Sequence, residues 1–237
     1  MNEFGSIVKY KEKVANSVLY KAKTLYKLGR DLKKVLARVD KGKFAVVNEK
    51  YKDVSPEPGY SKYLNIEFWM KRNMWHVFML GLENEKPKNI LDIGTGNGYF
   101  PFICTYYGHT VRTIDIWTDP MFNELIDLLK LQRRDYEIKN LEAVPPFDIK
   151  FDVITGFMVC FNGHHSPLLW TSKEWDFFLR DMATNHCNPN AEAYFTLNEE
   201  RDTLLWYTDE LYNWFVANGA EVDGERIYFK SLDRFRN

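Results

Sequence analysis

The stretch Asn89–Gly98 reads NILDIGTGNG and decides the fold. Its first half, NILDI, is a short apolar run of the kind that forms a buried parallel strand. Three glycines follow at alternate positions, 94, 96 and 98, and allow the backbone to turn tightly and to approach a ligand without interference from Cβ atoms. We therefore expect a strand that ends in a ligand-binding loop, followed by a helix that begins at Gly98 and ends near Tyr107.

Outward from this loop, strand patterns and helix patterns alternate along the chain. Such alternation predicts right-handed strand–helix–strand units, and hence an α/β fold with a doubly wound, mostly parallel sheet covered by helices on both faces. Apolar runs predict the strands, and helical spacing with capping residues predicts the helices. We expect strands at 109–117, 136–140, 150–157 and 192–198, helices at 66–82, 119–134, 172–185 and 201–218, and a hairpin at 220–230.

The N-terminal quarter of the chain has a different pattern. Between Lys13 and Val39, apolar residues recur every three or four positions, which predicts an amphipathic helix with a basic opposite face. Residues 51–64 contain two prolines and a glycine, and we interpret them as a connector. The sequence thus predicts a basic helical segment with its connector at 1–61, and a main domain at 62–237. The apolar stripe of the helix consists of Val18, Leu25, Leu28, Leu32, Val35, Leu36 and Val39.

Charge is distributed unevenly between these two parts. The chain has a formal net charge of −1, yet residues 1–50 carry 13 Lys and Arg against 5 Asp and Glu, so the remainder sums to −9. A basic segment of this kind could bind nucleic acid, an anionic lipid surface or an acidic protein. Alternatively, it is a solvated helix whose leucine stripe packs on the main domain or on a second copy of the chain.

Composition limits the class of protein. The 237 residues are 45% hydrophobic and 27% charged, which is typical of a soluble globular chain. Three scattered cysteines are too few for a disulfide framework. We find no run of about 18 apolar residues that would span a bilayer and no secretory leader pattern at the start, and therefore expect a cytoplasmic protein.

The residues LDIGTGNGYF and TIDIW resemble the class I S-adenosylmethionine-dependent methyltransferases, over about residues 66–230. The resemblance implies a seven-stranded-type sheet and S-adenosylmethionine as cofactor, with S-adenosylhomocysteine as product. It also implies that Asp92 places the methionine end, that the loop Gly94–Gly98 passes under the cofactor, and that Asp115 binds the ribose hydroxyls. Asn140 or Glu142 would meet the adenine amine. The cofactor-binding residues expected from the resemblance are Asp92, Gly94, Thr95, Gly96, Gly98, Asp115, Ile116, Asn140 and Glu142.

A nicotinamide dinucleotide is the rival cofactor, because its fingerprint G-x-G-x-x-G also follows a first strand. Here the third glycine arrives one position early, and Tyr99 occupies the place of the fingerprint's last glycine. Asp92 also stands where a dinucleotide fold normally has no acid. S-adenosylmethionine is therefore the favoured ligand, and a glycine-rich turn without a ligand remains as the other interpretation.

The methyl acceptor is expected beyond the fourth strand, at residues 156–165, which read GFMVCFNGHH. His164 is our candidate for a general base, and Asn162 is our candidate for orienting the acceptor. His164 could equally be a loop histidine that bonds to solvent. We interpret Cys160 as a buried small residue. Because Thr155-Gly156 supplies no carboxylate where metal-dependent relatives have one, we expect no metal.

Aromatic residues are dense around this segment, and they could form a lid or a face for a sugar or planar acceptor, although most are more simply core residues. They are Tyr60, Tyr63, Trp69, Trp117, Phe157, Phe161, Trp170 and Trp175. Without nucleic-acid methyltransferase motifs, we expect methyl transfer to an oxygen or nitrogen of a small-molecule or glycan-like acceptor. The alternatives are an RNA or protein methyltransferase that uses the basic arm, and a catalytically silent cofactor-binding partner subunit. A homodimer through the N-terminal helix is also compatible with the sequence.

Overall fold

The computed structural model describes residues 18–53, 59–116, 119–159, 161, 170–199 and 205–236. The chain divides into two compact units. The helical unit comprises residues 1–87, 96–109 and 117–132, and the sheet unit comprises 88–95, 110–116 and 133–237. The predicted boundary between residues 61 and 62 stays a prediction.

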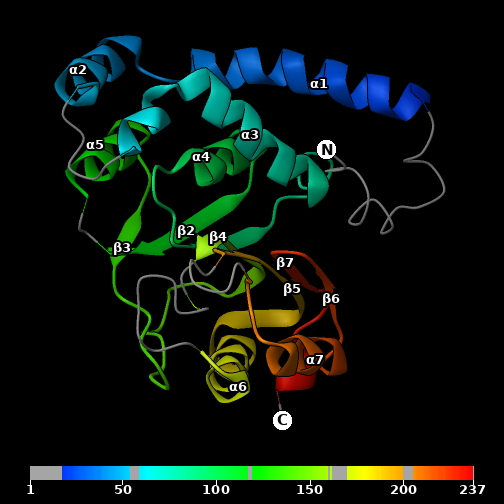
Figure 1. The fold of residues 1–237 in the computed structure, drawn as a ribbon. Coiled ribbons are helices and arrows are strands. Elements are labelled where there is room, and N and C mark those ends of the chain that lie inside the picture. The colour runs from blue at the N-terminus through cyan, green and yellow to red at the C-terminus, as the bar shows by residue number, and fades with distance from the viewer. Residues whose placement is uncertain are drawn as a thin grey trace. The chain divides into compact units, whose positions relative to one another are not determined.

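The sheet unit contains seven strands in the order β3-β2-β1-β4-β5-β7-β6 (Figure 1). All neighbouring strands run parallel except β7, which is antiparallel to both β5 and β6. This confirms the expected α/β, doubly wound, mostly parallel sheet. The strand order reverses between β1 and β4, and in such sheets ligands bind at the carboxyl ends of the strands at that point. The strands are β1 (Asn89–Ile93), β2 (Thr110–Asp115), β3 (Arg133–Asp135), β4 (Phe151–Val159), β5 (Cys187–Leu197), β6 (Ala220–Asp223) and β7 (Arg226–Phe229).

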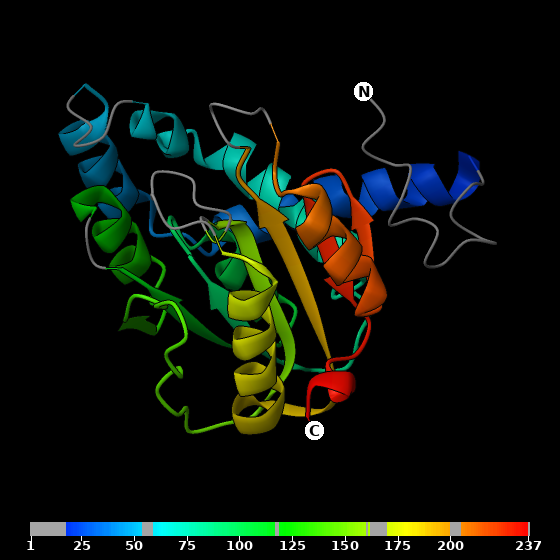
Figure 2. The same cartoon turned by 60° about the horizontal axis from the view of Figure 1, so that its bottom comes forward.

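Two helices, α6 (Ser172–Asp181) and α7 (Asp209–Ala217), pack on one face of this sheet (Figure 2). The predicted capping box begins α6: Thr171 caps the helix, and Glu174 accepts from the Thr171 backbone N–H. The core beneath the helices is aromatic, and Trp175 is completely buried in it. Phe161 stacks on Trp170 with ring centroids 4.2 Å apart. These rings are therefore core residues, because large aromatics contribute most when their area leaves water.

The helical unit contains α1 (Val18–Ala37), α2 (Lys41–Tyr51), the short 3-10 helix η2 (Tyr60–Leu64), α3 (Ile66–Met79), α4 (Tyr99–Tyr106) and α5 (Pro120–Leu128). Helix α1 packs on α3. Its stripe residues Leu28 and Val35 are buried, whereas Leu25 is 53% exposed. Most of the apolar stripe of α1 is thus buried within the chain itself. Helix α2, which the sequence analysis did not predict, begins after Asp40, whose side chain accepts from the backbone N–H of Lys43.

Two of our sequence predictions are wrong near β3. The helix predicted at 119–134 ends at Leu128, and β3 occupies 133–135 instead of 136–140. Lys130 adopts a left-handed φ of 56°, and the backbone N–H of Leu131 donates to the carbonyl of Ile126, which closes the helix early. The segment RRD has no apolar run, so only pairing with β2 identifies it as a strand.

A third prediction is wrong at its N-terminal boundary. The helix expected at 201–218 begins at Asp209, because Thr208 caps it by accepting from the backbone N–H of Leu211. Residues 200–204 lie outside the described part of the chain. Among the described helices, none combines the length and the apolar character needed to cross a bilayer.

Candidate functional site

The first candidate residue, Asp92, lies near the carboxyl end of β1 and is only 2% exposed. Its Oδ1 accepts a hydrogen bond from Thr155 Oγ1 at 2.7 Å, and its Oδ2 accepts one from Thr95 Oγ1 at 2.7 Å. Burial raises the pKa of Asp92 to about 7, the two hydroxyls oppose that rise, and the charge of Asp115 adds to it. A cation that binds beside a buried carboxyl group of this kind stabilises its ionised form.

The glycine loop follows β1, and its three glycines all have left-handed φ angles: 66° at Gly94, 50° at Gly96 and 77° at Gly98. Residues other than glycine rarely adopt such φ angles. In the sheet unit, Gly94 donates its N–H to the carbonyl of Ile114 at 2.9 Å, and a Cβ on Gly94 would lie 3.2 Å from Val159 Cγ1. The backbone at Gly94, where the loop begins, therefore lies close to the sheet.

The chain enters the helical unit between Thr95 and Gly96. There, Gly98 precedes the first residue of α4. A Cβ on Gly98 would lie 2.6 Å from Ile126 Cδ1 and 2.7 Å from Leu131 Cδ1, so a larger residue would require these two side chains to move as well as an unfavourable left-handed φ. The predicted helix after the loop is confirmed, and it begins at Tyr99.

The second acid, Asp115, ends β2 and is half-buried. Its Oδ1 accepts from the backbone N–H of Ile116 at 2.8 Å, which fixes the orientation of the carboxylate. The Ile116 side chain is 45% exposed. A carboxylate beside an exposed apolar side chain is suited to a ligand that carries hydroxyl groups next to a planar apolar group.

Asn140 and Glu142 lie in the loop after β3, not at the end of a strand. Between them, Leu141 has a φ of 55° and is 39% exposed. Glu142 Oε1 accepts a 3.4 Å hydrogen bond from the Tyr136 hydroxyl. The contact of Asn140 or Glu142 with an adenine amine stays a prediction.

This loop is fixed at its far end by the sheet unit. Arg134 donates to the carbonyls of Pro145 at 2.7 Å and Pro146 at 2.9 Å. The backbone N–H of Val144 donates to the buried Asp181 at 2.9 Å. These bonds hold the segment between β3 and β4 even though it forms no strand.

The acceptor candidates Asn162 and His164 lie outside the described residues, as do Cys160 and His165. Their roles stay predictions. The described residues contain no group of three His, Cys, Asp or Glu side chains that could hold a metal ion.

The sequence analysis missed Thr155, which we considered only as a position lacking an acid. Its hydroxyl is fully buried and binds Asp92, its partner in the β1–β4 register. Thr95 was predicted to bind the cofactor, and its hydroxyl binds Asp92. The sequence does show a hydroxyl residue, Thr155, two positions before the end of an apolar run. Only the strand register shows that this hydroxyl lies beside Asp92.

No protein-family model matches the chain, and no curated protein matches its sequence. Many solved structures resemble the fold. Streptomyces venezuelae DesVI is 11% identical, with a TM-score of 0.48, over 68% of this chain and 90% of DesVI. An S-adenosylmethionine-bound amino pentose methyltransferase from Micromonospora echinaspora is 14% identical, with a TM-score of 0.41, over 55% of this chain and 51% of that enzyme. A methyltransferase from Aquifex aeolicus is 20% identical, with a TM-score of 0.44, over 66% and 87%.

Proposed function

We propose that this chain is an enzyme that transfers a methyl group from S-adenosylmethionine to an oxygen or nitrogen of a small-molecule or glycan-like acceptor. The observation that carries the proposal is the placement of Asp92 and Asp115 toward the carboxyl ends of the adjacent strands β1 and β2, with a loop of left-handed glycines directly after β1. The two carboxylates and the apolar Ile116 side chain suit the cofactor, which has a cationic amino acid end, two ribose hydroxyls and a planar base.

Each residue has a distinct role in this proposal. Asp92 attracts the α-ammonium group of the methionine moiety, and Thr95 and Thr155 hold its carboxylate in place. Asp115 accepts hydrogen bonds from the ribose, and Ile116 packs against the base. When bound, S-adenosylmethionine supplies an electrophilic methyl group, whose bond to sulfur breaks as a lone pair of the acceptor bonds to the methyl carbon.

The protein accelerates the transfer by holding the acceptor atom in line with the methyl group. A hydroxyl acceptor also has to lose a proton, and His164 is the proposed base, with Asn162 orienting the acceptor. Loss of His164 should therefore matter most for a hydroxyl acceptor and least for a neutral amine.

The acceptor class rests on the acidic balance outside residues 1–50, where the net charge is −9. An acidic surface repels phosphate backbones, so a small acceptor is favoured over RNA. Methylation of RNA or protein through the basic N-terminal segment is the second candidate, and a silent cofactor-binding subunit is the third. A cytoplasmic location and a homodimer through the N-terminal helix also belong to the proposal.

Incubation with methyl-labelled S-adenosylmethionine and separate small-molecule, RNA and protein pools tests the proposal. Label in the small-molecule pool is the expected result, and it should fall in a His164→Ala variant if the acceptor is a hydroxyl. Label in RNA or protein alone would contradict the acceptor class. Cofactor binding without label in any pool would favour the silent subunit.

A further inference from the structure

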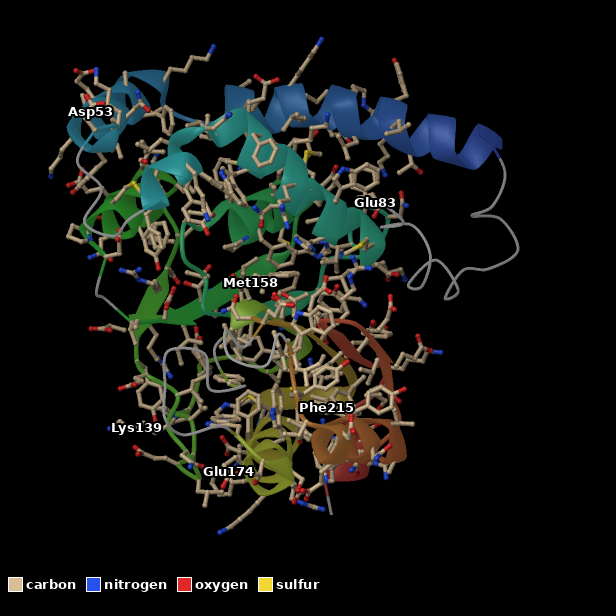
Figure 3. All side chains as sticks on the ribbon, in the orientation of Figure 1. Asp53, Glu83, Lys139, Met158, Glu174 and Phe215 are labelled. Carbon is tan, nitrogen blue, oxygen red and sulfur yellow. The ribbon has the colours of Figure 1, made fainter. Side chains whose placement is uncertain are left out.

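Met158 has a backbone conformation that its residue type rarely adopts. Its φ is 56°, in the left-handed region. The residue lies at the carboxyl end of β4 (Figure 3). Between Gly156 and Val159 the β4–β5 register shifts by one residue, because Phe157 and Met158 together oppose Thr196 alone. This is a β-bulge, a device that redirects a side chain and occurs often beside active sites.

Two side chains from the end of β5 hold this conformation. Thr196 Oγ1 accepts from the backbone N–H of Met158 at 2.8 Å, and Asn198 Nδ2 donates to the Met158 carbonyl at 2.7 Å. Thr196 is buried, so its hydroxyl has little freedom to turn away. Both backbone polar groups of Met158 are thus bonded to side chains, one near the end of β5 and one directly after it. A strained backbone conformation persists only where several surrounding contacts hold it, and such conformations cluster at functional sites.

The held backbone leaves the Met158 side chain 55% exposed, although the next residue, Val159, is buried in the core. A single exposed apolar side chain is ordinary on a protein surface. What distinguishes Met158 is that a strained backbone, held by two side chains, fixes where this thioether is presented.

The strand register indicates what lies next to this side chain. Asp92 pairs with Thr155, and Ile93 pairs with Gly156. Met158 follows two residues later, level with the loop that begins at Gly94, and the adjacent Val159 Cγ1 would lie only 3.2 Å from a Cβ on Gly94. Asp115 is on the opposite side of β1. Met158 therefore flanks the methionine end of the proposed cofactor site, on the side away from the ribose.

We propose that Met158 is a specificity-determining residue whose side chain lies against the sulfur of the bound cofactor and forms an apolar wall that the acceptor contacts. Thr196 and Asn198 are positioning residues that fix this wall. The inference rests on the proposed function. Since a thioether offers no charge and only a weak hydrogen-bond acceptor, the acceptor face that meets it is uncharged and apolar, such as the C–H face of a sugar ring.

Oxidation by hydrogen peroxide, followed by peptide mass spectrometry, tests the position of Met158 on the full chain. S-adenosylhomocysteine should slow oxidation of Met158 by about fivefold or more, because oxidation of methionine follows exposure. Met79, half-buried on α3, is the internal control and should change little. Calorimetry on the same sample establishes that the ligand binds. Unchanged Met158 oxidation in a sample that binds the ligand would overturn the inference, whereas absence of binding would overturn the proposed function.

A matched pair of variants tests the positioning role. Thr196→Val removes the acceptor for the Met158 N–H, and Thr196→Ser keeps it. At a concentration of S-adenosylhomocysteine that calorimetry shows to saturate each variant, the valine variant should lose most of the protection of Met158, and the serine variant should keep it. Equal protection in both variants would overturn the role of Thr196.

Met158→Ala and Met158→Leu test specificity with methyl-labelled S-adenosylmethionine and the small-molecule fraction that the wild type labels. The alanine variant should transfer label roughly tenfold more slowly or worse, since loss of apolar contacts in a pocket has effects of that size. Leucine, which keeps the apolar bulk, should retain most of the activity. Wild-type rates in the alanine variant would contradict the specificity role.

Discussion

Replacement of Asp92 by asparagine is predicted to make the protein more stable and less able to bind its cofactor. Asp92 is buried, and its folded pKa of about 7 lies far above the ordinary value of 3.8. A carboxyl group whose pKa is raised by folding contributes stability that is fully present below its unfolded pKa and is lost as the pH rises through the folded pKa. Ionised Asp92 therefore lowers the free energy of unfolding most above pH 7.

The size of the effect follows from the two pKa values. One pKa unit corresponds to about 1.4 kcal/mol. At pH 8 the buried carboxylate therefore lowers the free energy of unfolding by about 4 kcal/mol, relative to a group that is always neutral. At pH 5 the folded protein holds the proton, and the cost is about 1–2 kcal/mol. An amide at residue 92 keeps a hydrogen-bonding partner for both Thr95 and Thr155, because either hydroxyl can turn to accept.

The assay is urea unfolding of the wild type and Asp92→Asn at pH 5 and pH 8, together with calorimetry of S-adenosylmethionine binding. The stability of the variant relative to the wild type should rise by about 2–3 kcal/mol from pH 5 to pH 8, and the variant should bind the cofactor more weakly than the wild type does. Asp148→Asn is the control: Arg112 lowers the pKa of Asp148, so this difference should stay flat over the same range. A flat difference for Asp92→Asn as well would refute the reasoning.

Three further predictions, one of them with a matched control variant, test separate parts of the structure. Asp115→Ala should weaken S-adenosylmethionine binding roughly 10- to 100-fold in calorimetry, because hydrogen bonds to a charged group contribute about 1.5–3 kcal/mol; unchanged affinity would exclude Asp115 from the site. Gly98→Ala, with its left-handed φ of 77° and overlap with Ile126, should lower the free energy of unfolding by about 1–3 kcal/mol in urea. Leu28→Ala, in the buried stripe of α1, should lower the free energy of unfolding by about 2–5 kcal/mol. Leu25→Ala, on the exposed side of the same helix, should lower it little. Equal decreases in the two variants would contradict the packing of α1.

Local patterns were sufficient to predict the central strands and the glycine loop after β1. The runs NILDI and FDVIT are apolar and bounded by glycine, and the sequence alone places Asp92 and Asp115 at the ends of β1 and β2. Strand β3 could not be predicted, because Arg133–Asp135 has no apolar residue and exists only through its pairing with β2. Helix α2 lacks a continuous apolar face, since Val47 is buried and Val46 is exposed, so its periodicity gave no signal.

The missed parts of the candidate site depend on contacts between residues far apart in the sequence. Thr155 reaches Asp92 across 63 positions of the chain, and Thr196 reaches Met158 across 38. Neither a threonine in an apolar run nor a methionine after one has a local pattern that distinguishes it from a core residue. The strand register creates both contacts, and it becomes known only with the fold.

Calorimetric titration of the wild-type chain with S-adenosylmethionine measures whether the site at Asp92 and Asp115 binds this cofactor. We expect saturable binding with one cofactor per chain. Binding should weaken on acidification from pH 8 to pH 6, because burial raises the pKa of Asp92 to about 7 and the protonated carboxyl no longer attracts the ammonium group. Absence of binding at pH 8 would contradict the cofactor site, and with it the proposed methyl transfer.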